Sequence, residues 1–264
     1  MRIYSIYNTT IKLLLNIKNK SKERFLKKLF LVEGKKEIKK ALKGGYILKK
    51  IFLCDDFFFS KKYLKFFKKK EITKISFKVF KKLAYRDNVD GIIGLFKIKY
   101  TSLKLLKISP CPIFFILEGI EKPGNLGAIL RISSALGIDA VILCDSKVDF
   151  FNPNVIRSSV GYIFLNQIVK TSSKSVIKWI KKEKIIILLA TPKKNSNNIY
   201  KKNFRLSDPV AIVFGTESNG ISKIWFNEFN NNIQIPIKKT VDSLNLSSAA
   251  AIIGFEILRQ RYFI

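Results

Sequence analysis

Residues 235–261 read IPIKKTVDSLNLSSAAAIIGFEILRQR, a stretch that combines the end of a short strand, a polar turn and a long apolar helix. We expect the strand over residues 233–237. Ser243 is a suitable N-cap for the helix, because its hydroxyl can accept from the free backbone N–H groups of the first turn. Asn245 and Ser247 place two further polar groups in that turn. A plain capped amphipathic helix would explain Ser243 but not these two side chains, so the pattern favours a ligand site at the helix start.

Two earlier stretches carry motifs that belong with this one. Residues 118–131 read EGIEKPGNLGAILR, and residues 213–220 read VFGTESNG. Together the three stretches contain N-x-G-x-x-x-R, then G-x-E-x-x-G after a strand, then I-P followed by S-L-N-x-S. This ordered set resembles the SpoU/TrmH-type RNA ribose 2′-O-methyltransferases of the SPOUT superfamily, over roughly residues 113–261. The resemblance implies a parallel-sheet domain with a trefoil knot, S-adenosylmethionine as cofactor, and a homodimer in which the second subunit completes the active site.

The charge of the chain is strongly basic and unevenly distributed. Of 264 residues, 50 are Lys or Arg and 19 are Asp or Glu, a net charge of +31. Residues 1–108 hold 30 basic and 8 acidic side chains, against 20 and 11 in residues 109–264. The first part therefore carries most of the positive field that would attract a polyanion such as RNA.

Several classes of protein are excluded by composition. The chain has no histidine, which removes Ser-His-Asp and Cys-His catalysis and every histidine metal ligand. Cys54, Cys111 and Cys144 are far apart and form no C-x-x-C, so we expect no metal site and no disulfide framework. No apolar run reaches the length of a membrane span, and the N-terminus does not read as a signal peptide. We therefore expect a cytoplasmic protein that does not associate with membranes.

The first part of the chain reads as a small α/β domain, which we place at residues 1–108. We expect helices within residues 9–28, 35–42, 61–69 and 77–84, and strands at 30–34, 47–53, 72–75 and 91–98. Residues 30–53, FLVEGKKEIKKALKGGYILKKIFL, resemble the ribosomal-protein-like substrate-binding domain that precedes the catalytic domain in many SpoU-type enzymes. The alternative is a generic α/β sandwich whose lysines form a solvated face.

The second part, residues 109–264, is the expected catalytic domain. Residues 99–112, which end in Ser-Pro-Cys-Pro, read as the linker, because paired prolines disfavour regular structure. Apolar strands are expected at residues 113–117, 140–144, 185–190 and 210–214, with helices between them. Continuous apolar strands that alternate with helices predict a parallel sheet covered on both faces. Such sheets bind ligands at the carboxyl ends of their strands, where all three motifs fall.

The helix that contains the first motif places an arginine at the end of a face formed by glycine and alanine. Gly124, Gly127, Ala128 and Arg131 share one helix face, because residues three, four and seven apart are neighbours. The resemblance places Asn125 and Arg131 at the reaction centre. A guanidinium is a poor base, so we expect Arg131 to bind the phosphate of the target nucleotide and to lower the pKa of the ribose hydroxyl. The alternative is a surface arginine on an amphipathic helix.

The remaining site residues follow from the resemblance. Glu217 orients Asn125 or the RNA, or else stabilises a helix N-terminus. The resemblance implies that S-adenosylmethionine is held by the backbone at Gly215, Ile235 and Leu244, with Thr191 nearby. Ser243 and Asn245 would complete the site. Arg157, in the segment DFFNPNVIRSSVG at residues 149–161, is expected to contact RNA or the partner subunit.

Three functions compete. The first is 2′-O-methylation of a ribose in structured RNA, with ribosomal RNA favoured over tRNA because a separate basic domain is present. The second is a nicotinamide enzyme, suggested by a Gly-rich turn with Asp145 about twenty residues on, although the turn lacks the full G-x-G-x-x-G. The third is a non-catalytic RNA-binding or ribosome-assembly protein. Five intact site residues argue against the third: Asn125, Arg131, Glu217, Ser243 and Asn245.

Overall fold

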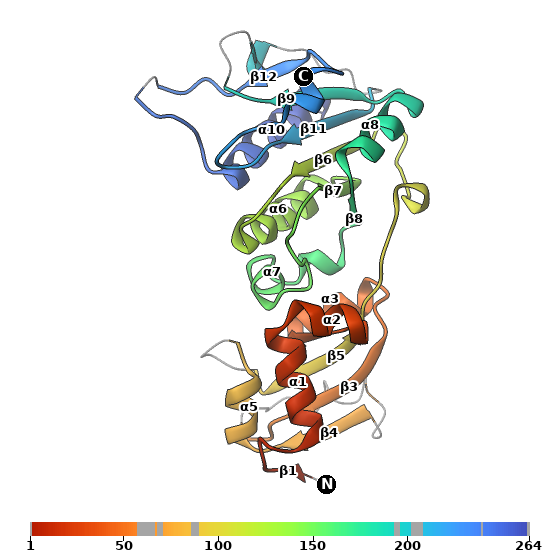
Figure 1. Cartoon of the computed structure of the whole chain (residues 1–264), viewed down its shortest axis with the longest axis vertical. Coiled ribbons are helices and arrows are strands. Elements are labelled where there is room, and N and C mark those ends of the chain that lie inside the picture. The colour runs from red at the N-terminus through yellow and green to blue at the C-terminus, as the bar shows by residue number, and fades with distance from the viewer. Residues whose placement is uncertain are drawn as a thin grey trace. The chain divides into compact units, whose positions relative to one another are not determined.

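The structure is a computed structural model that describes residues 2–56, 67, 71–85, 90–192, 196–201, 208–238 and 240–262. The chain forms two compact units (Figure 1). The first unit comprises Met1–Lys99 and Asp149–Leu165, and the second comprises Tyr100–Val148 and Asn166–Ile264. Segment 149–165, which follows the expected domain boundary in sequence, thus belongs to the first unit.

The first unit is built on a mixed five-stranded sheet in the order β1-β4-β3-β5-β2. Strands β1, β4 and β3 pair in parallel, and β5 pairs antiparallel to β3 and β2. Its elements are β1 (Arg2–Ile3), α1 (Thr9–Asn19), α2 (Ser21–Lys27), β2 (Leu29–Glu33), α3 (Lys35–Lys43), β3 (Leu48–Leu53), β4 (Ile72–Ile75), α5 (Phe77–Leu83), β5 (Ile92–Lys97), α7 (Pro153–Ser158) and the 3₁₀ helix η3 (Tyr162–Phe164). The elements expected within residues 9–53 and 72–98 are confirmed, with ends that shift by one residue or so. The helix expected at residues 61–69 lies outside the described residues.

Helix α1 packs on this sheet because its apolar residues recur at three-residue intervals. Ile11, Leu14 and Ile17 are fully buried and share a core with Phe52 of β3 and Ile93 of β5. Helix α5 adds further apolar residues to the same core. An α/β domain in this part of the chain, as expected, is therefore observed.

Segment 149–165 is held in the first unit by a buried ion pair and by aromatic packing. Arg24 donates from Nε to the carboxylate of Asp149 at 2.6 Å, and both side chains are almost fully buried. The ring of Phe30 stacks on Phe151, with centroids 4.4 Å apart, and on Phe164. A charged pair that is both buried and hydrogen-bonded fixes the segment to α2.

The second unit is built on a seven-stranded, fully parallel sheet in the order β10-β12-β9-β11-β6-β7-β8. Its elements are η2 (Leu103–Leu105), β6 (Ile113–Glu118), α6 (Pro123–Leu136), β7 (Ala140–Cys144), β8 (Ile168–Thr171), α8 (Ser173–Lys182), β9 (Ile186–Ala190), β10 (Asn197–Asn198), η4 (Ile199–Lys201), β11 (Val210–Phe214), α9 (Lys223–Phe226), β12 (Asn232–Gln234) and α10 (Leu246–Tyr262). The predicted parallel sheet is confirmed. The strand expected at 233–237 ends earlier, at Gln234. Strand β8, which is short and contains a lysine, was not predicted.

Helices cover both faces of this sheet, which explains the continuous apolar strands. Phe114 of β6 packs toward α8, in a core that also contains Trp225 of α9. On the other face α6 and α10 lie side by side (Figure 1). A Cβ added at Gly254 of α10 would meet Leu136 of α6 at 2.5 Å and Phe115 of β6 at 3.0 Å, so glycine permits this close packing. The trefoil knot implied by the resemblance stays a prediction.

Within the part of the chain that the structure describes, no helix combines the length and the apolar character needed to cross a bilayer.

Candidate functional site

A cavity of about 500 Å³ opens at the carboxyl ends of β9, β11 and β12. The segments that line it are residues 190–192, the turn after β11, residues 233–237 and the start of α10. Apolar side chains such as Phe214, Ile233 and Ile253 line it together with polar ones such as Thr191 and Ser243. The volume and the mixed lining are typical of small-molecule sites, and the place is where parallel sheets bind ligands.

The turn after β11 brings its backbone to the cavity because glycine begins and ends it. Thr216 and Gly220 exchange backbone hydrogen bonds at 2.9 and 3.0 Å, and the Thr216 hydroxyl accepts from the N–H of Asn219 at 2.9 Å. A Cβ at Gly215 would lie 2.0 Å from the carbonyl carbon of Gly220. Gly220 has φ of +66°, which L side chains rarely adopt. The turn can therefore close only with glycine at position 215.

Helix α10 begins at Leu246, so the expectation that Ser243 caps it is wrong. Asn245 holds the capping position. Its side-chain oxygen accepts from the N–H of Ser247 at 2.9 Å, and its carbonyl accepts from Ala249. Helix geometry closes only after Asn245, which leaves the exposed Ser243 to line the cavity.

A chain of hydrogen-bonded side chains, here called the polar chain, joins the three motifs. Lys122 and Asn125 donate to different carboxylate oxygens of Glu217. Asn125 Oδ1 accepts from Asn245 Nδ2 at 3.2 Å, and Asn245 Oδ1 accepts from the hydroxyl of Ser247 at 2.7 Å. The polar chain therefore connects the start of α6, the turn after β11 and the start of α10 at one edge of the cavity.

A buried carboxylate supports the segment that follows the turn. Glu118, at the end of β6, is 7% exposed. It accepts from the N–H of Ser222 at 2.9 Å and from its hydroxyl at 2.6 Å, while Ser173 Oγ lies 3.4 Å away. Because a buried carboxylate needs such donors, Glu118 fixes the path of the chain directly after the turn, at Ser222.

Arg131 lies apart from the other predicted catalytic residues. It follows Asn125 by six positions along α6, roughly 9 Å of helix rise, and it does not line the cavity. Its side chain is exposed and forms no hydrogen bond or ion pair with any residue that the structure describes. On the same face, a Cβ at Gly124 would have nothing within 4 Å. This face of α6 is open to a partner from outside the cavity.

The structure thus brings together the predicted catalytic and cofactor-binding residues except Arg131. Those that line the cavity are Thr191, Gly215, Glu217, Ile235, Ser243, Leu244 and Asn245. Asn125 is joined to them by hydrogen bonds, and Arg131 is outside. Sequence reasoning missed Lys122, whose position directly before the helix-starting Pro123 was its only local signal.

Asp145, the acidic residue on which the nicotinamide-enzyme alternative depends, has a structural role. Asp145, at φ of +51°, accepts from the N–H of Ser173 at 3.0 Å and so stabilises the start of α8. The neighbouring Cys144 is buried, and burial raises the pKa of its thiol to about 12, with the charge of Asp145 acting in the same direction. Burial and the raised pKa leave the Cys144 thiol unsuited to nucleophilic catalysis.

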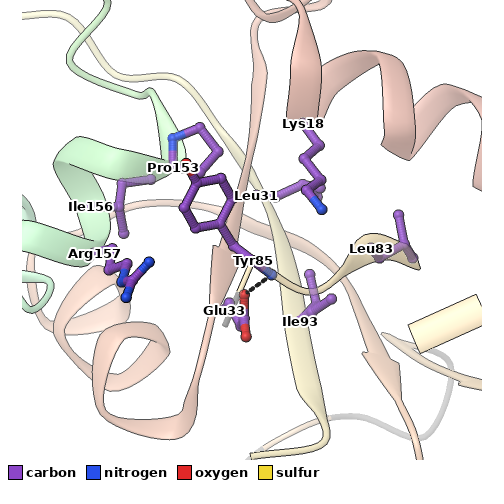
Figure 2. A pocket seen from close by; sticks show the side chains of 9 residues that line it. All are labelled: Lys18, Leu31, Glu33, Leu83, Tyr85, Ile93, Pro153, Ile156 and Arg157. Atoms are coloured by element: carbon purple, nitrogen blue, oxygen red, sulfur yellow. Dashed lines mark hydrogen bonds between the residues drawn. The ribbon is translucent and has the colours of Figure 1, made fainter. Parts of the chain in front are cut away.

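Arg157 lies at a smaller concave site in the first unit, beside Tyr85, Lys18 and Glu33 (Figure 2). The Arg157 guanidinium carbon and Lys18 Nζ lie 6.0 and 5.8 Å from the centre of the Tyr85 ring. Burial lowers the pKa of Lys18, an effect that the charge of Glu33 opposes. The Tyr85 hydroxyl donates to Asn154 at 2.6 Å. With a volume of about 30 Å³, the site has room for water but not for an organic ligand.

Among the described residues, no group of three or more Cys, Asp or Glu side chains could hold a metal ion.

Comparison with known proteins decides the family. The profile of the SpoU rRNA Methylase family matches residues 112–255, more than half of the chain. The chain belongs to the SpoU rRNA methylase family. Residues 8–94 of this SpoU-family chain match a second profile, the MRM3-like substrate binding domain.

Three similar proteins show the extent of the likeness. The SpoU-family chain is 30% identical over 144 residues to the 23S rRNA (uridine(2479)-2'-O)-methyltransferase of Streptomyces viridochromogenes, covering 53% of the chain and 50% of that protein. It is 24% identical over 237 residues to the 23S rRNA (guanosine(2553)-2'-O)-methyltransferase RlmP of Bacillus subtilis, covering 89% and 91%. A crystal structure of an RNA 2'-O ribose methyltransferase is 34% identical and covers 98% and 99%, with a TM-score of 0.85. For several relatives the matched region spans only about half to three fifths of the relative's own length.

Proposed function

We propose that this chain transfers a methyl group from S-adenosylmethionine to the 2′-hydroxyl of a ribose in ribosomal RNA of the 23S type. The observation that carries the proposal is the convergence of the three motifs on one cavity edge through the polar chain. Relatives named as 23S rRNA 2′-O-methyltransferases support the substrate class.

The cavity residues fit the proposed cofactor. A volume of about 500 Å³ suits a nucleoside with an amino-acid tail. Apolar side chains can contact the faces of adenine, and the backbones at Gly215, Ile235 and Leu244 can hydrogen-bond its edge, since adenine carries no charge. Thr191 and Ser243 would bind the polar groups of the cofactor. When bound, S-adenosylmethionine supplies an electrophilic methyl group.

The polar chain would position the target ribose. Glu217 holds the side-chain amide of Asn125 by a charge-assisted hydrogen bond, and Asn245 fixes Asn125 from the other side. We propose that Asn125 thereby presents a fixed amide to the nucleotide. Lys122 orients Glu217 through their ion pair, so Lys122 is a positioning residue rather than a catalytic one.

Arg131 would act on the phosphate of the target nucleotide. Its exposed side chain has no partner within the described chain, and a planar guanidinium binds phosphate through two hydrogen bonds. Because Arg131 lies outside the cavity of its own chain, we propose a homodimer in which a second copy helps to complete the active site. The open face at Gly124 leaves room for such an approach.

The basic first part of the chain would bind the RNA. Its net charge is +22 over residues 1–108, and residues 8–94 match a substrate-binding profile. We propose that residues 1–108 select structured ribosomal RNA in the cytoplasm, while residues 109–264 carry the chemistry.

The test is methyl transfer from labelled S-adenosylmethionine to unmodified total ribosomal RNA and total tRNA. Wild type should label a ribose 2′-O position in ribosomal RNA, and Arg131→Ala should abolish labelling without weakening cofactor binding. Lys178→Ala, which removes one exposed cation from α8, is the matched control and should retain activity.

Other outcomes would revise the proposal. Labelling of tRNA alone would reassign the substrate. Cofactor binding without an RNA acceptor would favour a non-catalytic assembly role, and failure to bind the cofactor would refute the proposed activity.

A further inference from the structure

Tyr4 and Tyr7 are the most exposed aromatic side chains among the described residues. Their exposed fractions are 67% and 75%. Neither lies in the region that matches a family profile, because the substrate-binding match begins at residue 8. Exposed aromatic side chains that lie close together, unlike singly exposed ones, are typical of a binding surface.

The exposure of the two rings is built into a fixed turn. Ile3 and Ile6 pack against the core of the first unit, while Tyr4 and Tyr7, which directly follow them, are exposed. The Ser5 hydroxyl accepts from the N–H of Tyr7 at 3.1 Å, which holds the turn. Strand β1, which precedes the turn, pairs in parallel with β4. The rings are therefore presented by ordered backbone on both sides.

Each ring has a cation beside it. The guanidinium carbon of Arg2 lies 5.6 Å from the centre of the Tyr4 ring, and Lys12 Nζ lies 5.9 Å from the centre of the Tyr7 ring. A side chain that offers a flat apolar face next to a positive charge suits a nucleotide, which has a flat base and a negative phosphate.

A third aromatic side chain adjoins this turn. Phe77, 43% exposed, begins α5. The preceding Ser76 donates from its N–H to the carbonyl of Ile3 at 2.9 Å and lies with its hydroxyl 3.4 Å from the carbonyl of Tyr4. The start of α5 is thus joined to the turn that carries the two tyrosines.

We propose that Tyr4, Tyr7 and Phe77 form a stacking surface for unpaired bases of the RNA substrate, with Lys12 contacting a phosphate and with Arg2, which is ion-paired with Asp56, flanking the Tyr4 ring. The inference rests on the proposed function for the identity of the RNA. Base stacking on aromatic side chains is how proteins bind single-stranded RNA. The net charge of +22 over residues 1–108 favours this polyanion over a second protein.

The test compares two RNA probes on the full chain. The double variant Tyr4→Ala/Tyr7→Ala should bind a single-stranded oligouridine of about 12 nucleotides roughly 100-fold more weakly than wild type, about tenfold for each lost ring. Binding of an RNA duplex of equal length should not change, because its bases are already stacked. The salt dependence should also stay the same, because no charge is removed.

Two further variants make the test specific. Tyr200→Ala/Tyr262→Ala removes two exposed rings from the second unit and should leave both affinities unchanged. Tyr4→Trp/Tyr7→Trp keeps the aromatic faces and should retain oligouridine binding, which guards against misfolding of the alanine variant.

Some results would overturn the inference. Wild-type oligouridine affinity in Tyr4→Ala/Tyr7→Ala would do so, as would a change in oligomeric state with unaltered RNA affinity, which would assign the rings to a protein interface. Cofactor binding and methyl transfer by wild type are measured separately, so a failure of the proposed activity is distinguished from a failure of the stacking surface.

Discussion

The side-chain amide of Asn245 donates to Asn125 Oδ1 at 3.2 Å, and this bond joins residues 120 positions apart. One residue precedes the last helix, and the other lies in the first turn of α6. Both side chains are exposed or half-buried, so the bond holds the cavity edge together while leaving it accessible.

Replacing Glu217 with Gln should weaken catalysis more than cofactor binding. Glu217 accepts from Lys122 and Asn125, and loss of charge-assisted bonds of this kind costs about 1.5–3 kcal/mol. We expect kcat for methyl transfer to fall roughly 10- to 100-fold, and the Kd for S-adenosylmethionine, measured by calorimetry, to change by less than about threefold.

The matched control is Glu228→Gln, which removes the partner of Lys181 from an exposed surface pair. It should leave both quantities unchanged. Equal decreases of kcat in the two variants would show that Glu217 contributes only to the net charge of the protein and does not position Asn125.

Replacing Gly215 with Ala should abolish cofactor binding. The added Cβ would lie 2.0 Å from the backbone of Gly220, so the turn that lines the cavity must open. Gly124→Ala is the comparison, because its Cβ would meet nothing within 4 Å and should stabilise α6 by about 0.5–1 kcal/mol. Calorimetry and thermal unfolding measure the two effects. Normal cofactor affinity in Gly215→Ala would contradict the proposed role of the turn.

Asp149→Ala should lower the free energy of unfolding by about 3 kcal/mol, because it leaves the buried charge of Arg24 without its partner. The exposed pair of Arg2 and Asp56 provides the contrast, and Asp56→Ala should cost less than about 1 kcal/mol. Urea-induced unfolding checks both values. Similar costs for the two variants would mean that the Asp149 pair is accessible to water.

Cys144 should resist alkylation in the native chain at about pH 8. Burial raises the pKa of its thiol from 9.0 to about 12, so the fold favours the protonated form. Its contribution to stability is therefore complete below pH 9 and is lost as the pH rises from 9 toward 12. Iodoacetamide labelling followed by mass spectrometry should modify the partly exposed Cys111 and spare Cys144 until urea is added. Equal labelling of Cys111 and Cys144 in the native chain would contradict the raised pKa of the Cys144 thiol.

Local patterns in the sequence predicted most of the elements, because their causes are local. Strands β4, β7 and β11 begin and end at the predicted residues, since each is a short run rich in apolar residues. Predictions that depend on neighbouring segments were less accurate. The strand before α10 ends at Gln234 instead of residue 237, and the helix is capped by Asn245 instead of the predicted Ser243. These boundaries depend on which segments pair and pack, and a propensity pattern does not contain that information.

The sequence by itself determined the chemistry available at the site: an amide at Asn125, a carboxylate at Glu217 and a glycine turn from Gly215. Only the tertiary structure decided that Glu217 meets Asn125 across 92 positions, that Lys122 shares its carboxylate, and that Arg131 stays outside the cavity. The reason is that the parallel sheet aligns the carboxyl ends of strands that are distant in sequence, whereas helix rise carries Arg131 away from the edge where they meet.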